Sequence, residues 1–478
     1  MRKESNITDR KERIYEILFI VFVFLFLFIW AKKAPLNSSP DEYMRFDVAE
    51  YIVNHGSLPD GRDPEIRNPN WGISYAFNPM TTCILAAVFA KTVSFFSDDF
   101  ELFYLSMRMI NVIFGTLLAF VTLRIGKRLF KRESAWFFTI LVVFLPGAAF
   151  LHTYLNMDSV AMLATACIFH CWVCAVQEGW YTSVCIRLGL SMSLCVLSYY
   201  NAYGFLLCSV FLFAGMMLKC GEKQWNYQEM FKKGFLMLGI VALCTGWWFI
   251  RNAILYDGDF LGMSTSDYYA ELYAIEELKP SNRATPQSLG MTLTQMLFWI
   301  PGGWHYNWMG TVMASFVGTF GFMDIFMPEL WTKIYLIFMG LGILGNVFCL
   351  RKYFSVSRQK IGEERIPGNQ GILIVKRYRR EQVWNGMNWM RVCLVIAMLI
   401  PVGLLLYYAY ASDFQAQGRY IMPGLLPLVY FITLGYETWL DKWVRKDSIK
   451  KRFWKLSSVA IVISGILVYV LVYAPNYS

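Results

Sequence analysis

Long runs of apolar residues, separated by short polar segments, recur along the whole chain. Each run is close to the length that crosses the hydrocarbon core of a bilayer as a helix, and each carries few charges. Closed barrels also span bilayers, but runs this long and this uniformly apolar exclude barrel strands. The expected fold is therefore an all-α polytopic membrane protein. The pattern predicts about eleven membrane-spanning helices, near residues 14–31, 102–123, 134–152, 159–177, 183–198, 200–218, 234–255, 328–350, 391–410, 421–438 and 455–473.

Clusters of Lys and Arg between these runs indicate which ends face the cytoplasm, because basic loops are retained on that side. The clusters are the N-terminus, 124–133, 219–233, 351–382 and 441–452. An even number of spans must separate two cytoplasmic clusters, yet three apolar runs lie between the N-terminus and 124–133. The middle run, 77–97, is interrupted by Lys91 and bracketed by Pro79 and a Ser-Asp-Asp sequence. We therefore expect it to lie on the membrane surface.

This topology predicts a single transmembrane domain over residues 1–478, with no soluble terminal domain. The first apolar run is followed by Lys-Lys-Ala-Pro rather than by a small-residue cleavage site, which indicates an uncleaved anchor. Part of the second outer loop, 306–322, is expected either to be re-entrant or to lie along the surface. The predicted non-spanning segments are a cytoplasmic tail at 1–13, extracytoplasmic loops at 33–101 and 257–327, and a basic cytoplasmic loop at 351–390.

Composition narrows the class of protein further. Hydrophobic residues make up 56% of the chain and charged residues only 16%, as expected of a membrane protein. The net charge of +10 resides mostly in the short basic segments between apolar runs. It is thus the sidedness signal of a membrane protein, and nucleic acid is not an expected partner. The middles of the apolar runs are nearly free of charge, which argues against an ion-coupled pump or channel.

Two adjacent acids, Asp41 and Glu42, follow the first apolar run in "SSPDEYMRFDVAEYIVNHG". One interpretation is structural: Ser39 is the N-cap of a helix, Pro40 takes its first position, and Glu42 completes a capping box. Acids in a first turn also oppose the positive end of the helix dipole. The other interpretation is that these carboxylates, on the extracytoplasmic side, act on a substrate. The local sequence alone leaves both open.

Other polar residues fall at the outward ends of the predicted spans, at the level of Asp41. Each by itself is typical of an interface anchor, since Trp, Tyr and Arg concentrate at headgroup level. As a set they place three guanidinium groups near the two acids, and arginine is suited to holding a phosphate with directed donors. The residues are Arg108, Asn156, Asp158, Tyr199, Tyr200, Asn201, Arg251, Gln417 and Arg419.

The segments that carry these residues resemble, in order, the GT-C superfamily of membrane glycosyltransferases. This superfamily includes protein O-mannosyltransferases and the transferases that add aminoarabinose to lipid A. Within it, the chain is most similar to a poorly characterised bacterial branch, and the resemblance covers roughly residues 15–435. The matching segments are "SSPDEYMRFDVAEYIVNHGSLP", "YAFNPMTTCILAAVFAK", "RMINVIFGTLLAFVTLRIGKRLF", "LPGAAFLHTYLNMDSVA", "GWWFIRNAILYDGDFLG" and "QGRYIMPGLLPL".

The resemblance implies an inverting glycosyltransferase of a bacterial plasma membrane that acts in cell-envelope glycan biosynthesis. Its donor would be a hexose or pentose on a polyprenyl phosphate, and its acceptor a hydroxyl on a glycan, lipid or protein outside the cytoplasm. By the same resemblance Asp41 would be the general base with Glu42 beside it. Arg251 and Arg419 would bind the donor phosphate, joined by Arg108. The expected substrate-binding residues are Asn156, Asp158, Tyr200, Asn201 and Gln417.

The expected chemistry needs an acid and a source of positive charge. Asp41 can take the proton of an acceptor hydroxyl as its oxygen attacks the anomeric carbon. The leaving polyprenyl phosphate needs its negative charge stabilised, by arginines or by a divalent metal such as Mg²⁺ or Mn²⁺. One position departs from the family pattern: Asn201 stands where related enzymes lead us to expect a lysine.

Two other functions stay open at this stage. A lipid-linked glycan transporter or flippase would be expected to carry a charged, water-filled pathway and repeated halves, and the sequence shows neither. A non-catalytic subunit of a cell-envelope glycan assembly system would need the stretch from Ser39 to Glu42 only as a helix cap.

Overall fold

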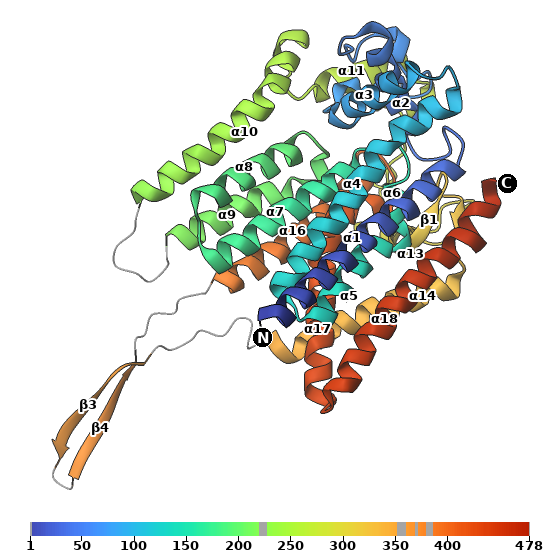
Figure 1. The fold of residues 1–478 in the computed structure, drawn as a ribbon. Helices are drawn as coiled ribbons and strands as arrows, with labels where there is room; N and C mark the ends of the chain where they lie inside the picture. Colours follow the sequence, from blue (N-terminus) through green and yellow to red (C-terminus); the bar gives the residue numbers. More distant parts are fainter. Residues whose placement is uncertain (1, 219–226, 351–359, 369–370, 379–385, 478) are drawn as a thin grey trace.

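The computed structural model describes residues 2–218, 227–350, 360–368, 371–378 and 386–477. It is a bundle of long helices that cross the view of Figure 1 in roughly the same direction, with shorter helices gathered at one end. In the described part of the chain, nine helices are long and apolar enough to cross a membrane. These spans are built on α1 (Arg2–Lys33), α4 (Phe100–Leu129), α7 (Asp158–Glu178), α9 (Gly204–Met217), α10 (Tyr227–Leu255), α14 (Glu329–Gly345), α16 (Gly386–Ala411), α17 (Leu425–Trp443) and α18 (Asp447–Val468).

Two of the eleven expected spans are shorter than predicted. The run at 134–152 is α5 (Arg132–Phe144) followed by α6 (Pro146–Leu151), because Pro146 starts a new helix after Leu145 leaves the helical conformation. The run at 183–198 is α8 (Thr182–Val196), a helix of 15 residues. At about 1.5 Å per residue, neither α5 nor α8 reaches the ~30 Å of a hydrocarbon core. Both are packed against neighbouring helices, α5 on α4 and α18 and α8 on α7 and α10.

The centre of the bundle is formed by α4, α5, α7 and α17. Helix α7 is apolar on nearly all sides, as its position requires, and Trp172 and Phe169 on it are fully buried. Helix α4 packs against α1, α5 and α7, so it joins the N-terminal helix to the core. In contrast, α10 lies at the edge of the bundle in Figure 1 and packs mainly on α8.

The segments 33–101 and 257–327 meet at one end of the bundle, where Figure 1 shows α2, α3 and α11 together. Helix α3 has 14 residues, too few to cross a membrane, and packs against α2 and α4. The helices of this end are α2 (Glu42–His55), α3 (Thr81–Ser94), α11 (Met263–Tyr273) and α12 (Leu293–Phe298), with short 3₁₀ turns η1 (Pro64–Ile66), η2 (Tyr75–Phe77) and η4 (Glu276–Leu278).

The segment 306–322 forms a short buried helix and the first strand of a hairpin. Helix α13 (Trp308–Gly318) leads into β1 (Thr319–Phe320), which pairs antiparallel with β2 (Ile325–Phe326). Helix α13 packs on α6 and on the 3₁₀ segment η6 (Gly418–Gly424). The approach is close: a Cβ on Gly418 would lie 2.2 Å from the backbone nitrogen of Phe316. This segment therefore lies within the bundle and supports η6.

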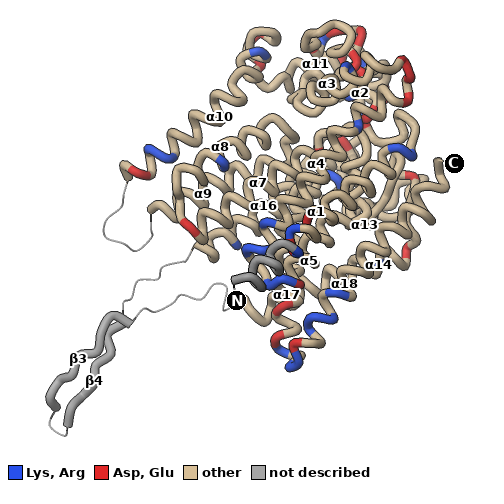
Figure 2. Tube along the Cα trace, in the orientation of Figure 1, with Lys and Arg blue, Asp and Glu red and all other residues tan. Residues whose placement is uncertain are grey.

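The charged residues divide between the two ends of the bundle. Figure 2 shows Lys and Arg around the N-terminal end, the start of α5 and the connection from α17 to α18. The opposite end carries α2, α3 and α11. Two of the predicted basic segments lie partly outside the described residues: 219–226 in the first, and 351–359, 369–370 and 379–385 in the second.

The remaining elements are η3 (Tyr200–Ala202), η5 (Asn346–Cys349), the antiparallel strands β3 (Lys360–Gly368) and β4 (Gly371–Tyr378), η7 (Tyr469–Tyr473) and η8 (Ala474–Tyr477).

Candidate active site

Asp41 stands at the start of α2 in a left-handed conformation, with φ 61° and ψ 8°. Asp is one of the few residue types that adopt this region readily. Its side chain forms no capping hydrogen bond, and the buried Ser39 hydroxyl has no partner either. The predicted capping box is therefore wrong: α2 begins at Glu42, after a turn closed by the Glu42 N–H and the Ser39 carbonyl at 3.3 Å.

The Asp41 carboxylate receives a hydrogen bond from Arg419, which comes from η6 far along the chain. The Arg419 Nη2 to Asp41 Oδ2 distance is 2.6 Å, and Arg45 Nη1 lies 3.8 Å from the same oxygen. The Arg419 side chain is 9% exposed, whereas that of Asp41 retains 27% exposure. One acid thus faces two guanidinium groups and still has an open side.

Opposing effects set the protonation state of Asp41. Burial is the largest effect and raises the pKa of the carboxyl, whereas the charges of Arg419 and Arg45 lower it. Hydrogen bonds from Arg419 and Tyr75 act in the same direction as these charges, and the net pKa lies below its usual value of 3.8. Asp41 is therefore ionised at neutral pH and can accept a proton.

The Arg419 guanidinium has further hydrogen-bond donors besides the one that binds Asp41. Its Nη2 also lies 3.2 Å from the Tyr420 hydroxyl, and Tyr420 in turn donates to the Gln415 side-chain oxygen. Its Nε and Nη1 are buried without a partner in the described part of the chain. A buried donor without a partner is costly and calls for a ligand or a water molecule.

A small cavity adjoins these free donors. It has a volume of about 20 Å³ and is lined by Arg419, Gln417 and Tyr154, among others. The Gln417 side-chain oxygen and the Tyr154 hydroxyl are also buried without a partner among the described residues. The cavity therefore brings unsatisfied donors and acceptors together in a space of about one water molecule.

Asp158 lies at the first residue of α7, beside this cluster. It is within electrostatic range of Arg419, Arg45 and Asp41, and its Oδ1 is buried without a partner in the described structure. The site thus contains two acids and two arginines, from α2, α7 and η6. Of the residues expected from the sequence, Asp41, Asp158, Gln417 and Arg419 come together here.

Glu42 and Arg108 form a different, fully buried pair. Arg108 Nε and Nη2 donate to the two carboxylate oxygens of Glu42 at 2.7 and 2.8 Å. The other donors of Arg108 reach the backbone oxygens of Ala31, Ala34 and Pro35 at 2.5–2.9 Å. All five N–H groups of the guanidinium are thereby used, so none is left for a phosphate in this structure. The Leu155 N–H also donates to Glu42, at 3.2 Å.

Asn156 holds the loop that leads into α7. Its side-chain amide donates to the backbone oxygens of Leu151 and Tyr154 at 2.7 and 2.9 Å, and its side-chain oxygen accepts the Ser159 N–H. These bonds close the turn between α6 and α7. Asn156 therefore positions Tyr154 and Asp158, and its own polar atoms point into the loop.

The "SYYNAYG" stretch lies next to the site through η3, which packs on η6. The rings of Tyr199 and Tyr420 have centroids 6.3 Å apart, whereas Tyr200 packs edge-on against Tyr203 at 5.3 Å. Asn201 is half-buried in the same turn. This stretch borders the cluster, with Tyr199 as the residue in contact with it.

Arg251 lies apart from the cluster, in contact with the segment 33–101. Its Nη2 donates to the Pro59 backbone oxygen at 2.5 Å, and its guanidinium lies 5.5 Å from the centroid of the Trp248 ring. Nearby, the Gly61 N–H donates to the Tyr256 hydroxyl at 3.0 Å. These contacts fasten residues 59–61 to the end of α10.

The arrangement of the helices is similar to that of solved membrane transferases. The oligosaccharyltransferase AglB from Archaeoglobus fulgidus, in complex with an inhibitory peptide and a dolichol-phosphate, has a TM-score of 0.54 at 11% identity, over 98% of this chain and 56% of that chain. The apo oligosaccharyltransferase of Archaeoglobus fulgidus has a TM-score of 0.50 at 12% identity, over 96% and 55%. The protein has the GT-C fold.

The chain spans about half the length of these oligosaccharyltransferases. ArnT from Cupriavidus metallidurans, bound to undecaprenyl phosphate, is also similar, with a TM-score of 0.49 at 11% identity over 95% of this chain and 70% of that chain. No protein-family model matches the sequence, and no curated protein matches it. At identities this low the structural similarity shows the fold alone, so the activity is inferred from the residues of the site.

In the described structure the acids of the site do not by themselves form a set of metal ligands. Among the described residues, no three His, Cys, Asp or Glu side chains gather as a ligand set. Asp41 and Asp158 are the two acids of the cluster, and Asp41 is already paired with Arg419. Mg²⁺ and Mn²⁺ prefer several oxygen ligands in a fixed geometry. Asp41 and Asp158 alone therefore do not complete a coordination shell, and the positive charges beside them in the described structure are Arg419 and Arg45.

The sequence did not predict three members of the cluster: Arg45, Tyr75 and Tyr420. Arg45 is 2% exposed and lies over the Tyr75 ring at 4.4 Å, and Tyr420 lies against Arg419. Arg45 could have been found, because it follows Asp41 by four positions and residues at this spacing share one face of a helix. Tyr75 carries no such signal, since it lies in the short turn η2, more than 30 positions from Asp41 in the chain.

Proposed function

We propose that the protein transfers a sugar from a polyprenyl-phosphate carrier to an acceptor hydroxyl, with inversion at the anomeric carbon, on the extracytoplasmic side of the plasma membrane. The observation that carries this proposal is the pairing of Asp41 with Arg419, at 2.6 Å, while two other donors of Arg419 stay unpartnered. One residue pair thus offers a proton acceptor and an anion-binding group side by side.

In this reaction Asp41 acts as general base. Its carboxylate takes the proton of the acceptor hydroxyl while the hydroxyl oxygen forms a bond to the anomeric carbon. The bond from that carbon to the phosphate oxygen breaks, and the electron pair leaves with the polyprenyl phosphate. Attack opposite to the leaving group inverts the configuration. The depressed pKa of Asp41 keeps the base ionised, and the 27% exposure of its side chain leaves access for the acceptor.

Arg419 stabilises the leaving phosphate. Its Nε and Nη1 are preorganised donors for the phosphate oxygens, on which negative charge develops as the sugar leaves. Gln417 and Tyr154 line the same cavity and are proposed to contact the phosphate or the sugar. Asp158, close to both arginines, is proposed to orient Arg419 and to bind a substrate hydroxyl.

The residues around this pair are proposed to position it. The Glu42–Arg108 pair joins the end of α1, the start of α2 and the loop before α7, and so fixes the backbone of Asp41. Arg251 fastens the loop at Pro59 and is proposed to control how that loop covers the site. The cavity of about 20 Å³ is far smaller than a sugar phosphate, so the outer loops must shift for the donor to enter.

A direct test is reconstitution in liposomes with a panel of radiolabelled polyprenyl-phosphate sugars, scoring release of polyprenyl phosphate. Release with one donor by the wild type, and its loss in the Asp41→Asn variant, are the expected results. A glycan flippase would move the labelled lipid across the bilayer without releasing the phosphate, and a non-catalytic subunit would do neither. Either outcome over the full panel would refute the proposal.

A further inference from the structure

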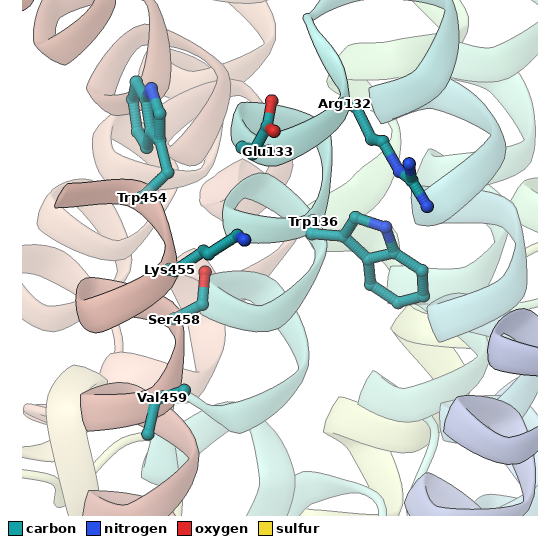
Figure 3. A pocket seen from close by; sticks show the side chains of 7 residues that line it. All are labelled: Arg132, Glu133, Trp136, Trp454, Lys455, Ser458 and Val459. Atoms are coloured by element: carbon teal, nitrogen blue, oxygen red, sulfur yellow. The ribbon is translucent and has the colours of Figure 1, made fainter. Parts of the chain in front are cut away.

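A second cavity lies far from Asp41, between the start of α5 and the first half of α18. It has a volume of about 470 Å³. Figure 3 shows the side chains that line it, with Lys455 reaching from α18 toward α5. Its lining includes Arg132, Glu133 and Trp136 from α5 and Trp454, Lys455 and Ser458 from α18. No part of the proposed reaction uses these residues.

The polar groups of this groove point to an anion. Arg132 and Lys455 form no hydrogen bond and no ion pair within 4.0 Å with the described residues. Ser458 is 8% exposed, and its hydroxyl also has no hydrogen-bond partner in the described structure. Glu133 is the one acid in the lining, and Glu12 is within electrostatic range of Arg132. Two free cations and a buried hydroxyl thus face a groove with one carboxylate.

The surroundings indicate that this anion is part of a lipid. Trp136 packs edge-on against Phe19 at 5.1 Å and Trp454 lies 5.0 Å from Phe137, so both indoles are fixed in the wall of the groove. Tryptophan and basic residues together are typical of the headgroup level of a membrane. Val459 also lines the groove, and Ile463 lies one helical turn further along α18; their side chains are 54% and 50% exposed. Acyl chains can lie on this surface while a phosphate sits between the cations.

We propose that the groove between α5 and α18 binds the phosphate of an anionic glycerophospholipid of the surrounding membrane. Arg132 and Lys455 neutralise the phosphate, and Ser458 donates a hydrogen bond to it. The basic residues that Figure 2 shows around this end of the bundle raise the local concentration of anionic lipid. The bound lipid ties α18 to α5, and through α5 to the core of the bundle.

The test uses the purified full-length protein in nanodiscs and in detergent, with phosphatidylglycerol and phosphatidylcholine as probes. Native mass spectrometry is expected to show retained phosphatidylglycerol, and added phosphatidylglycerol is expected to raise the melting temperature more than phosphatidylcholine does. The R132A/K455A variant is expected to bind phosphatidylglycerol roughly 30-fold more weakly, from about fivefold for each lost cation. The matched control, R445A/K446A, removes two exposed charges at the same end without touching the groove and is expected to bind normally.

Three results would overturn the proposal. Equal shifts with both lipids would mean that only the apolar surface binds. An undiminished phosphatidylglycerol shift in R132A/K455A would place the lipid elsewhere. Displacement of phosphatidylglycerol by equimolar undecaprenyl phosphate would assign the groove to the carrier lipid instead. If the double variant does not fold, the single variant K455E and the variant S458A provide the same comparison, since each changes one side of the groove.

Discussion

Arg419 meets Asp41 at 2.6 Å although 378 positions separate them in the chain. The pair joins η6, which is supported by α13, to the start of α2, which is held by Arg108 from α4. At this contact the segment 33–101 and the C-terminal half of the bundle share an ion pair. The two residues are proposed to divide the reaction, with the proton on Asp41 and the phosphate on Arg419.

Replacement of the base should affect turnover far more than binding. Asp41→Asn cannot accept the acceptor proton, and we expect turnover to fall by roughly 10²–10⁴-fold. Donor binding should remain, because Arg419 keeps its Nε and Nη1. Turnover is measured as release of polyprenyl phosphate, with the melting temperature of each variant as the control for folding. Near-wild-type turnover in a folded Asp41→Asn protein would leave the start of α2 with a structural role only.

Arg419 and Arg251 should behave differently when replaced. Arg419→Ala is expected to weaken donor binding, and Arg419→Lys to restore it only in part, because an ammonium group lacks the fork of donors. Arg251→Lys can still reach the Pro59 backbone oxygen, so we expect near-normal donor affinity in that variant. Donor affinity is measured by titration of a fluorescent polyprenyl phosphate. Equal losses in both lysine variants would mean that Arg251 also binds the phosphate.

The Glu42–Arg108 pair should govern stability. Removing one partner of a buried ion pair costs about 3–5 kcal/mol, so Glu42→Ala is expected to lower the melting temperature strongly. Glu42→Gln keeps an acceptor for Arg108 and should be milder. Turnover per folded molecule should fall much less in Glu42→Gln than in Asp41→Asn. A Glu42→Gln variant with wild-type stability and no turnover would instead place Glu42 among the reacting groups.

The stability of the end of the bundle that carries α2 should depend on pH through Asp47. Burial and the nearby Glu50 carboxylate raise the pKa of Asp47 to about 7. The folded protein then binds a proton that the unfolded chain has already lost, so stability falls as the pH rises from about 4 to about 7. Asp47→Asn removes this contribution. Its melting temperature should match the wild type near pH 4 and exceed it near pH 8, whereas a difference that is constant with pH would contradict the assignment.

The predicted topology can be tested with an impermeant thiol reagent added outside the cell. In a variant that lacks accessible native cysteines, Ser57→Cys and Asp98→Cys should both react, because 77–97 is expected not to cross the membrane. Helix α3 within that segment has 14 residues, about 21 Å of helix. Lys446→Cys is the matched control at the opposite end and should stay unlabelled until the membrane is permeabilised. Protection of Asp98→Cys alone would show that 77–97 crosses.

The helices of the bundle were largely determined by the sequence. A run of apolar residues forms a helix in a membrane because its backbone polar groups must be paired within the segment, and this requirement is local. Nine of the eleven predicted spans coincide with long apolar helices in the described chain. The other two contain shorter helices: Pro146 interrupts the first run after α5, and α8 has 15 residues.

The start of α2 differs from the structure that its local sequence predicts. Ser39 and Glu42 have the spacing of a capping box, and nothing in the adjacent sequence contradicts it. In the folded chain Arg108 takes the Glu42 carboxylate, with bonds of 2.7 and 2.8 Å, so that carboxylate cannot close a cap. The turn at Asp41 then adopts a left-handed conformation. A buried guanidinium from 66 positions away outweighs a local hydrogen bond, since a buried charge without its partner costs several kcal/mol.

The same limit applies to the site as a whole. The sequence identified Asp41, Asp158, Gln417 and Arg419 as polar residues at one level of the membrane, because sidedness follows from the alternation of apolar and basic segments. It also placed Arg108 and Arg251 at that level, and it could not say which arginine faces which acid. The tertiary structure decided this. The packing of α4 directs Arg108 to Glu42, and the packing of α13 on η6 brings Arg419 to Asp41, contacts that depend on side chains close in space and far apart in the chain.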